Sequence, residues 1–180
     1  MWANERWKGG LFPENCRSTD YLAHYSRYFN AVEGNTTFYA DPSAATIERW
    51  AASVPANFRF SLKVPKRLSH QVHPEPIAEL RQWLELLKPL SANIGFIHLQ
   101  LAESNRLAEP EKVMEFVNEI QQFAPCCVEV RNLSFFDKAQ HEQYLHHILR
   151  STQAERMCFD SRALFSVSAN SAELIDAQAK

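Results

Sequence analysis

Phe58-Arg59-Phe60-Ser61-Leu62-Lys63 is the stretch that decides the fold, because apolar and polar side chains alternate along it. Successive side chains of a strand point to opposite faces, so this strand has one apolar and one polar face. A parallel strand that helices cover on both sides is apolar throughout. In a closed barrel, by contrast, one face packs against helices and the other points inward. The alternation therefore favours a barrel, with a partly solvated mixed sheet as the alternative.

Four further short apolar segments end on a charged or amide side chain in the same way. The five end residues follow one another at intervals of 29 to 37 residues, which is about the length of one βα unit. Amphipathic segments that begin near residues 19, 44, 77, 110 and 138 lie between them and predict helices. This alternation implies parallel strands with right-handed crossovers. The end residues are Glu33, Lys63, Gln100, Glu129 and Asp160.

The fold class that follows is α/β, of the TIM-barrel-like (β/α) type, and incomplete in this chain. Eight βα units typically need about 250 residues. The chain has 180 residues and shows about five to six units. We therefore expect one partial TIM-barrel-like domain over residues 1–180, with its polar strand ends at the mouth where such barrels place their active sites.

Composition and charge narrow the class of protein. Hydrophobic residues make up 46% of the chain and charged residues 22%, which are ordinary values for a globular domain. A net charge of −2 gives no general electrostatic attraction to nucleic acid or to anionic membranes. No apolar run approaches the roughly 18 residues that span a bilayer. The start resembles no secretion signal and the four cysteines form no C-x-x-C pair, so we expect a cytoplasmic protein with reduced thiols.

Three carboxylates at the strand ends are the candidate catalytic residues, namely Glu33, Glu129 and Asp160. Two carboxylates across a barrel mouth suit general acid and base roles, because their environments can separate their pKa values. The same oxygens suit a divalent cation, so the cofactor stays unknown at this level. The alternative is a structural ion network, in which Lys63 and Arg131 neutralise the buried carboxylates.

Five other residues are candidate ligand-binding groups. Lys63 points inward by parity and opens the basic stretch that runs to His70, which suits a phosphate or carboxylate ligand. A charge run is more often a solvated loop, and nucleic acid is only a weakly supported partner for it. His98 also has inward parity, and we interpret it as a hydrogen-bonded core histidine. The ligand-binding candidates are Asn35, Lys63, His70, Gln100 and Arg131.

Several blocks of sequence carry a resemblance to a known family. They are Val32-Glu33-Gly34-Asn35-Thr36-Thr37-Phe38-Tyr39, Phe58 to Pro65, Ser69-His70, Gln100-Leu101, Val128-Glu129-Val130-Arg131 and Asp160-Ser161-Arg162. The set is similar to the YecE-like family, also called domain of unknown function 72. The resemblance implies a TIM-barrel-like fold, no established activity, and members with a strand before the position of Trp2 and more strands after Lys180.

Two departures from the family pattern affect loops at the mouth. Members commonly continue the Gln-Leu step with two prolines, where this chain has Ala102-Glu103. Members often show His-Pro after Glu-Val-Arg, where this chain has Asn132-Leu133. The sequence therefore predicts a site for a small polar or anionic molecule, acted on by acid–base or metal-assisted chemistry. A non-catalytic binding module and an inactive barrel fragment remain the alternatives.

Overall fold

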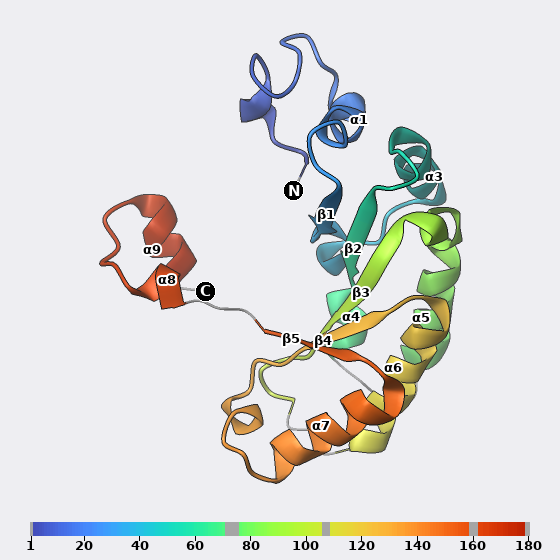
Figure 1. Ribbon diagram of the computed structural model, residues 1–180, viewed down its shortest axis with the longest axis vertical. Helices are drawn as coiled ribbons and strands as arrows, with labels where there is room; N and C mark the ends of the chain where they lie inside the picture. Colours follow the sequence, from blue (N-terminus) through green and yellow to red (C-terminus); the bar gives the residue numbers. More distant parts are fainter. Residues whose placement is uncertain (1, 71–75, 106–108, 159–161, 179–180) are drawn as a thin grey trace.

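One parallel sheet organises the molecule. The structure is a computed structural model that describes residues 2–70, 76–105, 109–158 and 162–178. Within these ranges, the sheet has five strands in the order β1-β2-β3-β4-β5, and every neighbouring pair is parallel (Figure 1). The strands are β1 Ala31–Gly34, β2 Arg59–Lys63, β3 Ile94–Gln100, β4 Cys126–Glu129 and β5 Glu155–Met157.

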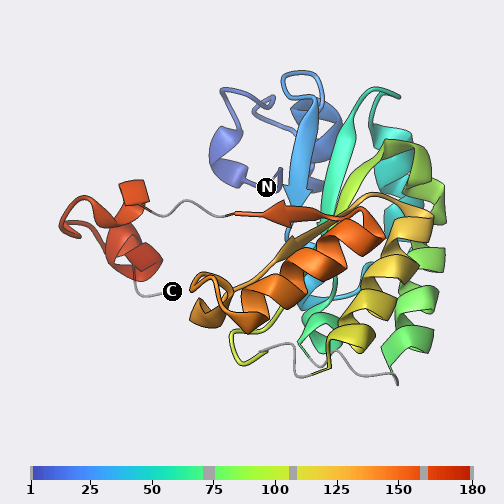
Figure 2. The same cartoon turned by 60° about the horizontal axis from the view of Figure 1, so that its bottom comes forward.

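Helices connect each strand to the next. Figures 1 and 2 show that α3, α5, α6 and α7 all lie along the same side of the sheet. The α-helices are α1 Tyr21–Tyr25, α2 Thr36–Tyr39, α3 Ala44–Ser53, α4 Lys66–Ser69, α5 Pro76–Leu86, α6 Pro110–Phe123, α7 Gln140–Thr152, α8 Arg162–Phe165 and α9 Ala172–Gln178. Short 3-10 turns are η1 Glu5–Trp7, η2 Ser18–Asp20, η3 Lys88–Asn93 and η4 Leu133–Phe135.

The alternation in β2 sorts its side chains as the sequence predicts. Phe58, Phe60 and Leu62 are fully buried between the sheet and the helices. Arg59 and Lys63 lie on the opposite face, where exposure is higher. The same helix-facing layer includes buried side chains of the other strands and of α6. The core therefore lies on one side of the sheet, and the polar face of the strands is not part of it.

Local sequence signals fix where the elements start. The Ser43 side chain accepts a hydrogen bond from the Thr46 backbone amide and caps α3. Pro110 stands in the first turn of α6, where a missing amide hydrogen costs nothing. At Gly34 a Cβ atom would lie 2.6 Å from a Leu62 methyl group, so a glycine lets β1 come close to β2.

The expectation of a barrel is met only in part. The α/β class and the parallel order are confirmed, but the sheet is open, and β1 and β5 each have a strand neighbour on one side only among the described residues. Barrel closure would need those two edges to be paired. The α8 and α9 helices contact each other and stand apart from the sheet in both views (Figures 1 and 2). No helix in the described ranges is long and apolar enough to cross a membrane.

Candidate functional site

The polar strand ends meet around one cavity at the carboxyl edge of the sheet. The cavity has a volume of about 350 Å³ and takes side chains from all five strands or the residues that follow them. Carboxyl edges of parallel strands are where α/β proteins bind ligands, so the position itself is informative. We call this cavity the mouth, and its lining residues are Glu33, Asn35, Ser61, Lys63, Phe96, His98, Glu129, Arg131, Met157 and Cys158.

Glu129 is the buried centre of charge in the mouth, with a side chain only 5% exposed. Its Oε1 accepts a 2.5 Å hydrogen bond from Arg131 Nε, and its Oε2 lies 2.7 Å from His98 Nε2. Burial would raise the pKa of Glu129, but His98 and Arg131 outweigh it and hold that pKa below its usual value. Glu129 is therefore an ionised carboxylate whose two oxygens are already occupied.

His98 joins the two glutamates of the mouth, and this role was not predicted. Its Nε2 faces Glu129, while its Nδ1 lies 4.0 Å from Glu33 Oε1. Neither ring nitrogen has a well-aligned hydrogen-bond partner among the described residues, although the ring is almost completely buried. His98 is buried, as expected for a core histidine, and its contacts with charged groups of the mouth are additional to that prediction. Its inward parity on β3 was the available signal.

Lys63 supplies the positive charge between the same carboxylates. Its Nζ lies 3.7 Å from Glu33 Oε1 and 4.0 Å from Glu129 Oε2, and it donates a 3.1 Å hydrogen bond to Gln100 Oε1. Gln100 thus touches the mouth through Lys63. A divalent cation would compete with this ammonium group for the same oxygens. The described residues contain no group of three His, Cys, Asp or Glu side chains arranged to hold a metal ion.

Glu33 and Asn35 are the least committed polar groups of the mouth. The Glu33 side chain is 52% exposed, and its charged neighbours among the described residues, Lys63 and His98, are both beyond hydrogen-bond distance. The Asn35 Oδ1 atom is buried and accepts no hydrogen bond among the described residues. Buried polar atoms are nearly always paired in folded proteins, so an unpaired acceptor in a cavity points to a missing donor.

His70 and Asp160 complete the residues proposed from sequence. The His70 ring lies 5.5 Å from the Phe38 ring, beside the mouth and outside its lining. Burial, Lys66 and Arg131 all lower the pKa of His70, so its ring stays neutral to lower pH. Asp160 lies outside the described residues. The structure therefore brings together six of the residues proposed from the sequence, and it adds His98, which was not proposed. The six are Glu33, Asn35, Lys63, Gln100, Glu129 and Arg131.

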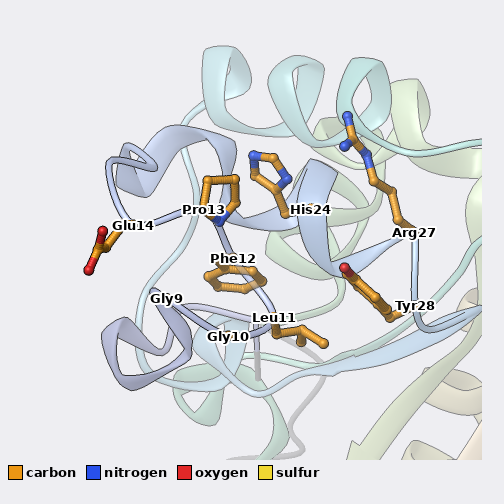
Figure 3. Close-up of a pocket in the computed structure, with 9 residues that line it drawn as sticks. All are labelled: Gly9, Gly10, Leu11, Phe12, Pro13, Glu14, His24, Arg27 and Tyr28. Atoms are coloured by element: carbon orange, nitrogen blue, oxygen red, sulfur yellow. The ribbon is translucent and has the colours of Figure 1, made fainter.

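A second hollow, of about 500 Å³, lies beside the amino-terminal segment (Figure 3). It is lined by Gly9 to Glu14 and by His24, Arg27 and Tyr28. In Figure 3 the Glu14 carboxylate and the Arg27 guanidinium lie on opposite sides of the Phe12 ring. Although this N-terminal hollow is larger than the mouth, its charged groups do not converge on one point.

Comparison with known proteins identifies the family. The family model described as "Protein of unknown function DUF72" matches residues 1–178. The chain belongs to the DUF72 family. Within it, UPF0759 protein YecE of Escherichia coli K12 is 34% identical over 160 residues, which are 88% of this DUF72 chain and 59% of YecE. UPF0759 protein YunF of Bacillus subtilis 168 is 25% identical over 150 residues, 75% of this chain and 51% of YunF.

Solved DUF72 structures share the fold. A DUF72 family protein from Enterococcus faecalis V583 superposes with a TM-score of 0.64 at 21% identity, over 75% of this chain and 57% of that one. A DUF72 family protein from Thermotoga maritima MSB8 gives a TM-score of 0.64 at 22% identity, over 87% and 61% of the two chains. This DUF72 chain thus spans less than two thirds of the proteins that it matches.

Proposed function

We propose that the DUF72 chain carries an acid–base active site for a small anionic molecule, with Glu33 as the proton-transfer group. One observation supports this most directly: two glutamates flank His98, but only Glu129 is saturated by partners. A carboxylate held by Arg131 and His98 is a poor proton acceptor, because protonation would break both contacts. Glu33 is half exposed at the cavity wall and free to meet a ligand.

Arg131 supports an anionic ligand. Among the described residues its guanidinium contacts only Glu129, through Nε, and the side chain is 45% exposed at the mouth. The two terminal nitrogens therefore present a planar fork, the geometry that binds carboxylate and phosphate in a bidentate way. Phe96 and Met157 line the same cavity, so the ligand meets an apolar wall beside the charged one.

The roles of the remaining groups follow from their contacts. Glu33 takes a proton from a ligand C–H or O–H group and returns it to the product. Lys63 places an ammonium group, and His98 places a hydrogen-bonding ring, next to Glu33. Both groups stabilise negative charge as it develops on the ligand. Glu129 orients His98 and Arg131 by binding both. Asp160, which lies outside the described residues, keeps the assisting role that the sequence predicts.

We propose that the five-stranded sheet that carries the site is part of a TIM-barrel-like fold. Its support is the strictly sequential parallel order, a helix layer on one face and a polar opposite face. In that arrangement the edges of β1 and β5 would each pair with a further strand. The free thiols of the described cysteines suit a reducing cytoplasm.

Solvent deuterium exchange tests the proposal. The purified chain is incubated in D2O with a panel of sugar phosphates and 2-keto acids, and new C–D bonds are followed by proton NMR. We expect exchange or turnover with at least one compound, a loss of about 100-fold or more in Glu33→Gln, and retained binding. The matched control is Glu14→Gln in the N-terminal hollow, which should keep full activity. Binding without turnover in the wild type would favour the non-catalytic module, and an active Glu33→Gln would exclude the assigned role.

A further inference from the structure

A row of aromatic rings borders the mouth, and it extends the proposed site. We infer that Phe38, Tyr39 and His70 form a stacking surface for a flat ring, so that the ligand is an anion joined to a base, of the nucleoside monophosphate class. This inference rests on the proposed function, because it assigns the anion to Arg131. We call the three residues the aromatic ledge.

The rings of the aromatic ledge contact one another. The Phe38 and Tyr39 ring centroids are 5.1 Å apart in an edge arrangement, and the His70 centroid is 5.5 Å from Phe38. Tyr39 is 81% exposed, and its ring packs on Phe38, whose ring in turn lies next to Lys63 of the mouth. A single exposed aromatic residue needs no explanation, but three adjoining rings at the edge of a charged site favour a binding surface.

The ledge is fixed to the mouth by backbone contacts. Phe38 and Tyr39 stand on α2, which follows β1 and Asn35 without a break, and His70 directly follows α4. The buried Thr37 hydroxyl lies 2.7 Å from the Lys63 carbonyl oxygen and 3.0 Å from the Gly34 carbonyl oxygen, so it ties α2 to β1 and β2. Lys63 Nζ lies 5.8 Å from the centre of the Phe38 ring, which places that ring next to the charged cluster.

Unsatisfied polar atoms lie on the same short segment as the ledge. Asn35 Oδ1 and Thr36 Oγ1 are both buried, and neither has a hydrogen-bond partner among the described residues. Both residues come between β1 and the two rings in the chain. The site therefore offers an anion clamp at Arg131, an unpaired hydrogen-bond acceptor at Asn35, which lines the mouth, and flat rings at Phe38 and Tyr39. A phosphate, a hydroxylated sugar and a base present the complementary groups.

Three probes of increasing size test the inference. Inorganic phosphate, ribose 5-phosphate and adenosine monophosphate are titrated into the 180-residue chain by calorimetry at one ionic strength. Stacking of one base on an aromatic side chain should make adenosine monophosphate bind about 10-fold more tightly than ribose 5-phosphate. Tyr39→Ala should remove that gain and leave the ribose 5-phosphate affinity unchanged.

A matched control and a second variant separate the two proposals. Tyr28→Ala removes another exposed tyrosine, from the N-terminal hollow, and should change none of the three affinities. Arg131→Gln should weaken all three probes. Equal affinity for ribose 5-phosphate and adenosine monophosphate, or an unchanged gain in Tyr39→Ala, would overturn the ledge and leave the anion site intact. No binding of any probe, or no effect of Arg131→Gln, would overturn the anion site, and the ledge with it.

Discussion

The mouth and the N-terminal hollow differ in a way that their sizes conceal. The hollow has the larger volume, about 500 Å³ against about 350 Å³, yet its Glu14 and Arg27 side chains lie on opposite sides of it. In the smaller mouth, Glu33, Lys63, His98, Glu129 and Arg131 form one connected set of close charge contacts. Charges that converge inside a protein cost desolvation energy, and such clusters are found at functional sites. The charge cluster is therefore better evidence for a functional site than the volume of a hollow.

Removal of Glu129 should have the largest effect. Glu129→Ala leaves Lys63, His98 and Arg131 without their common carboxylate, and breaking a buried pair in this way costs about 3 kcal/mol of unfolding free energy. Urea unfolding followed by circular dichroism measures the loss. Glu14→Ala, in the N-terminal hollow, should change stability by less than about 0.5 kcal/mol. Equal losses of unfolding free energy in the two variants would mean that the charges of the mouth contribute no more to stability than those of the N-terminal hollow.

Replacement of Lys63 should have a smaller effect in the same direction. Lys63→Met keeps the length of the side chain but removes the ammonium group between Glu33 and Glu129, and we expect a loss of about 2 kcal/mol. Arg27→Met is the corresponding change in the N-terminal hollow and should be neutral within about 0.5 kcal/mol. If Lys63→Met is as stable as the wild type, the mouth does not depend on its internal cation.

The pH dependence of stability should separate the wild type from Glu129→Gln. The native pKa of Glu129 is lowered from 4.5, so the unfolded chain binds more protons at mildly acidic pH. The stabilising contribution of Glu129 is therefore complete above its unfolded pKa and is lost as pH falls through the lower native value. Urea unfolding at pH 6, 4.5 and 3.5 should show a steeper decline in the wild type. Parallel curves would mean that the pKa of Glu129 does not differ between the native and the unfolded chain.

Thiol labelling gives the mildest test and leaves stability unchanged. Cys158 is exposed and lines the mouth, whereas Cys126 of β4 is buried, and burial raises the pKa of its thiol. Burial and Glu155 also raise the pKa of the half-buried Cys127. Iodoacetamide should therefore modify Cys158 first, Cys127 more slowly and Cys126 only after unfolding, as read by peptide mass spectrometry. Rapid modification of Cys126 would contradict the described packing of β4.

The sequence predicted the strand faces well, because side-chain parity is a local property. Phe60 and Leu62 are buried and Lys63 reaches the mouth, as the alternation in β2 requires. The helix starts at Ser43 and Pro110 were also visible, since capping depends on a few neighbouring residues. Strand alternation does not show whether the edges of the sheet pair, and it was the number of βα units that predicted an incomplete barrel in this chain.

The unequal environments of Glu33 and Glu129 were beyond the sequence. Both glutamates lie near the end of a strand with the same parity, but β1 is an edge strand among the described residues, whereas β4 lies between β3 and β5. Glu129 therefore has neighbours on both sides, and Glu33 has them on one. His98 was missed for a related reason: its contact with Glu129 depends on the pairing of β3 with β4, in which Gln100 stands opposite Glu129.

The sequential order of the sheet has a consequence for how the chain is made. Each strand pairs with the strand that precedes it in the sequence, so its partner has already left the ribosome when it emerges. We expect assembly to proceed one βα unit at a time from the amino terminus during synthesis, without waiting for distant segments. The mouth, which draws on every strand from β1 to β5, would be the last feature to form.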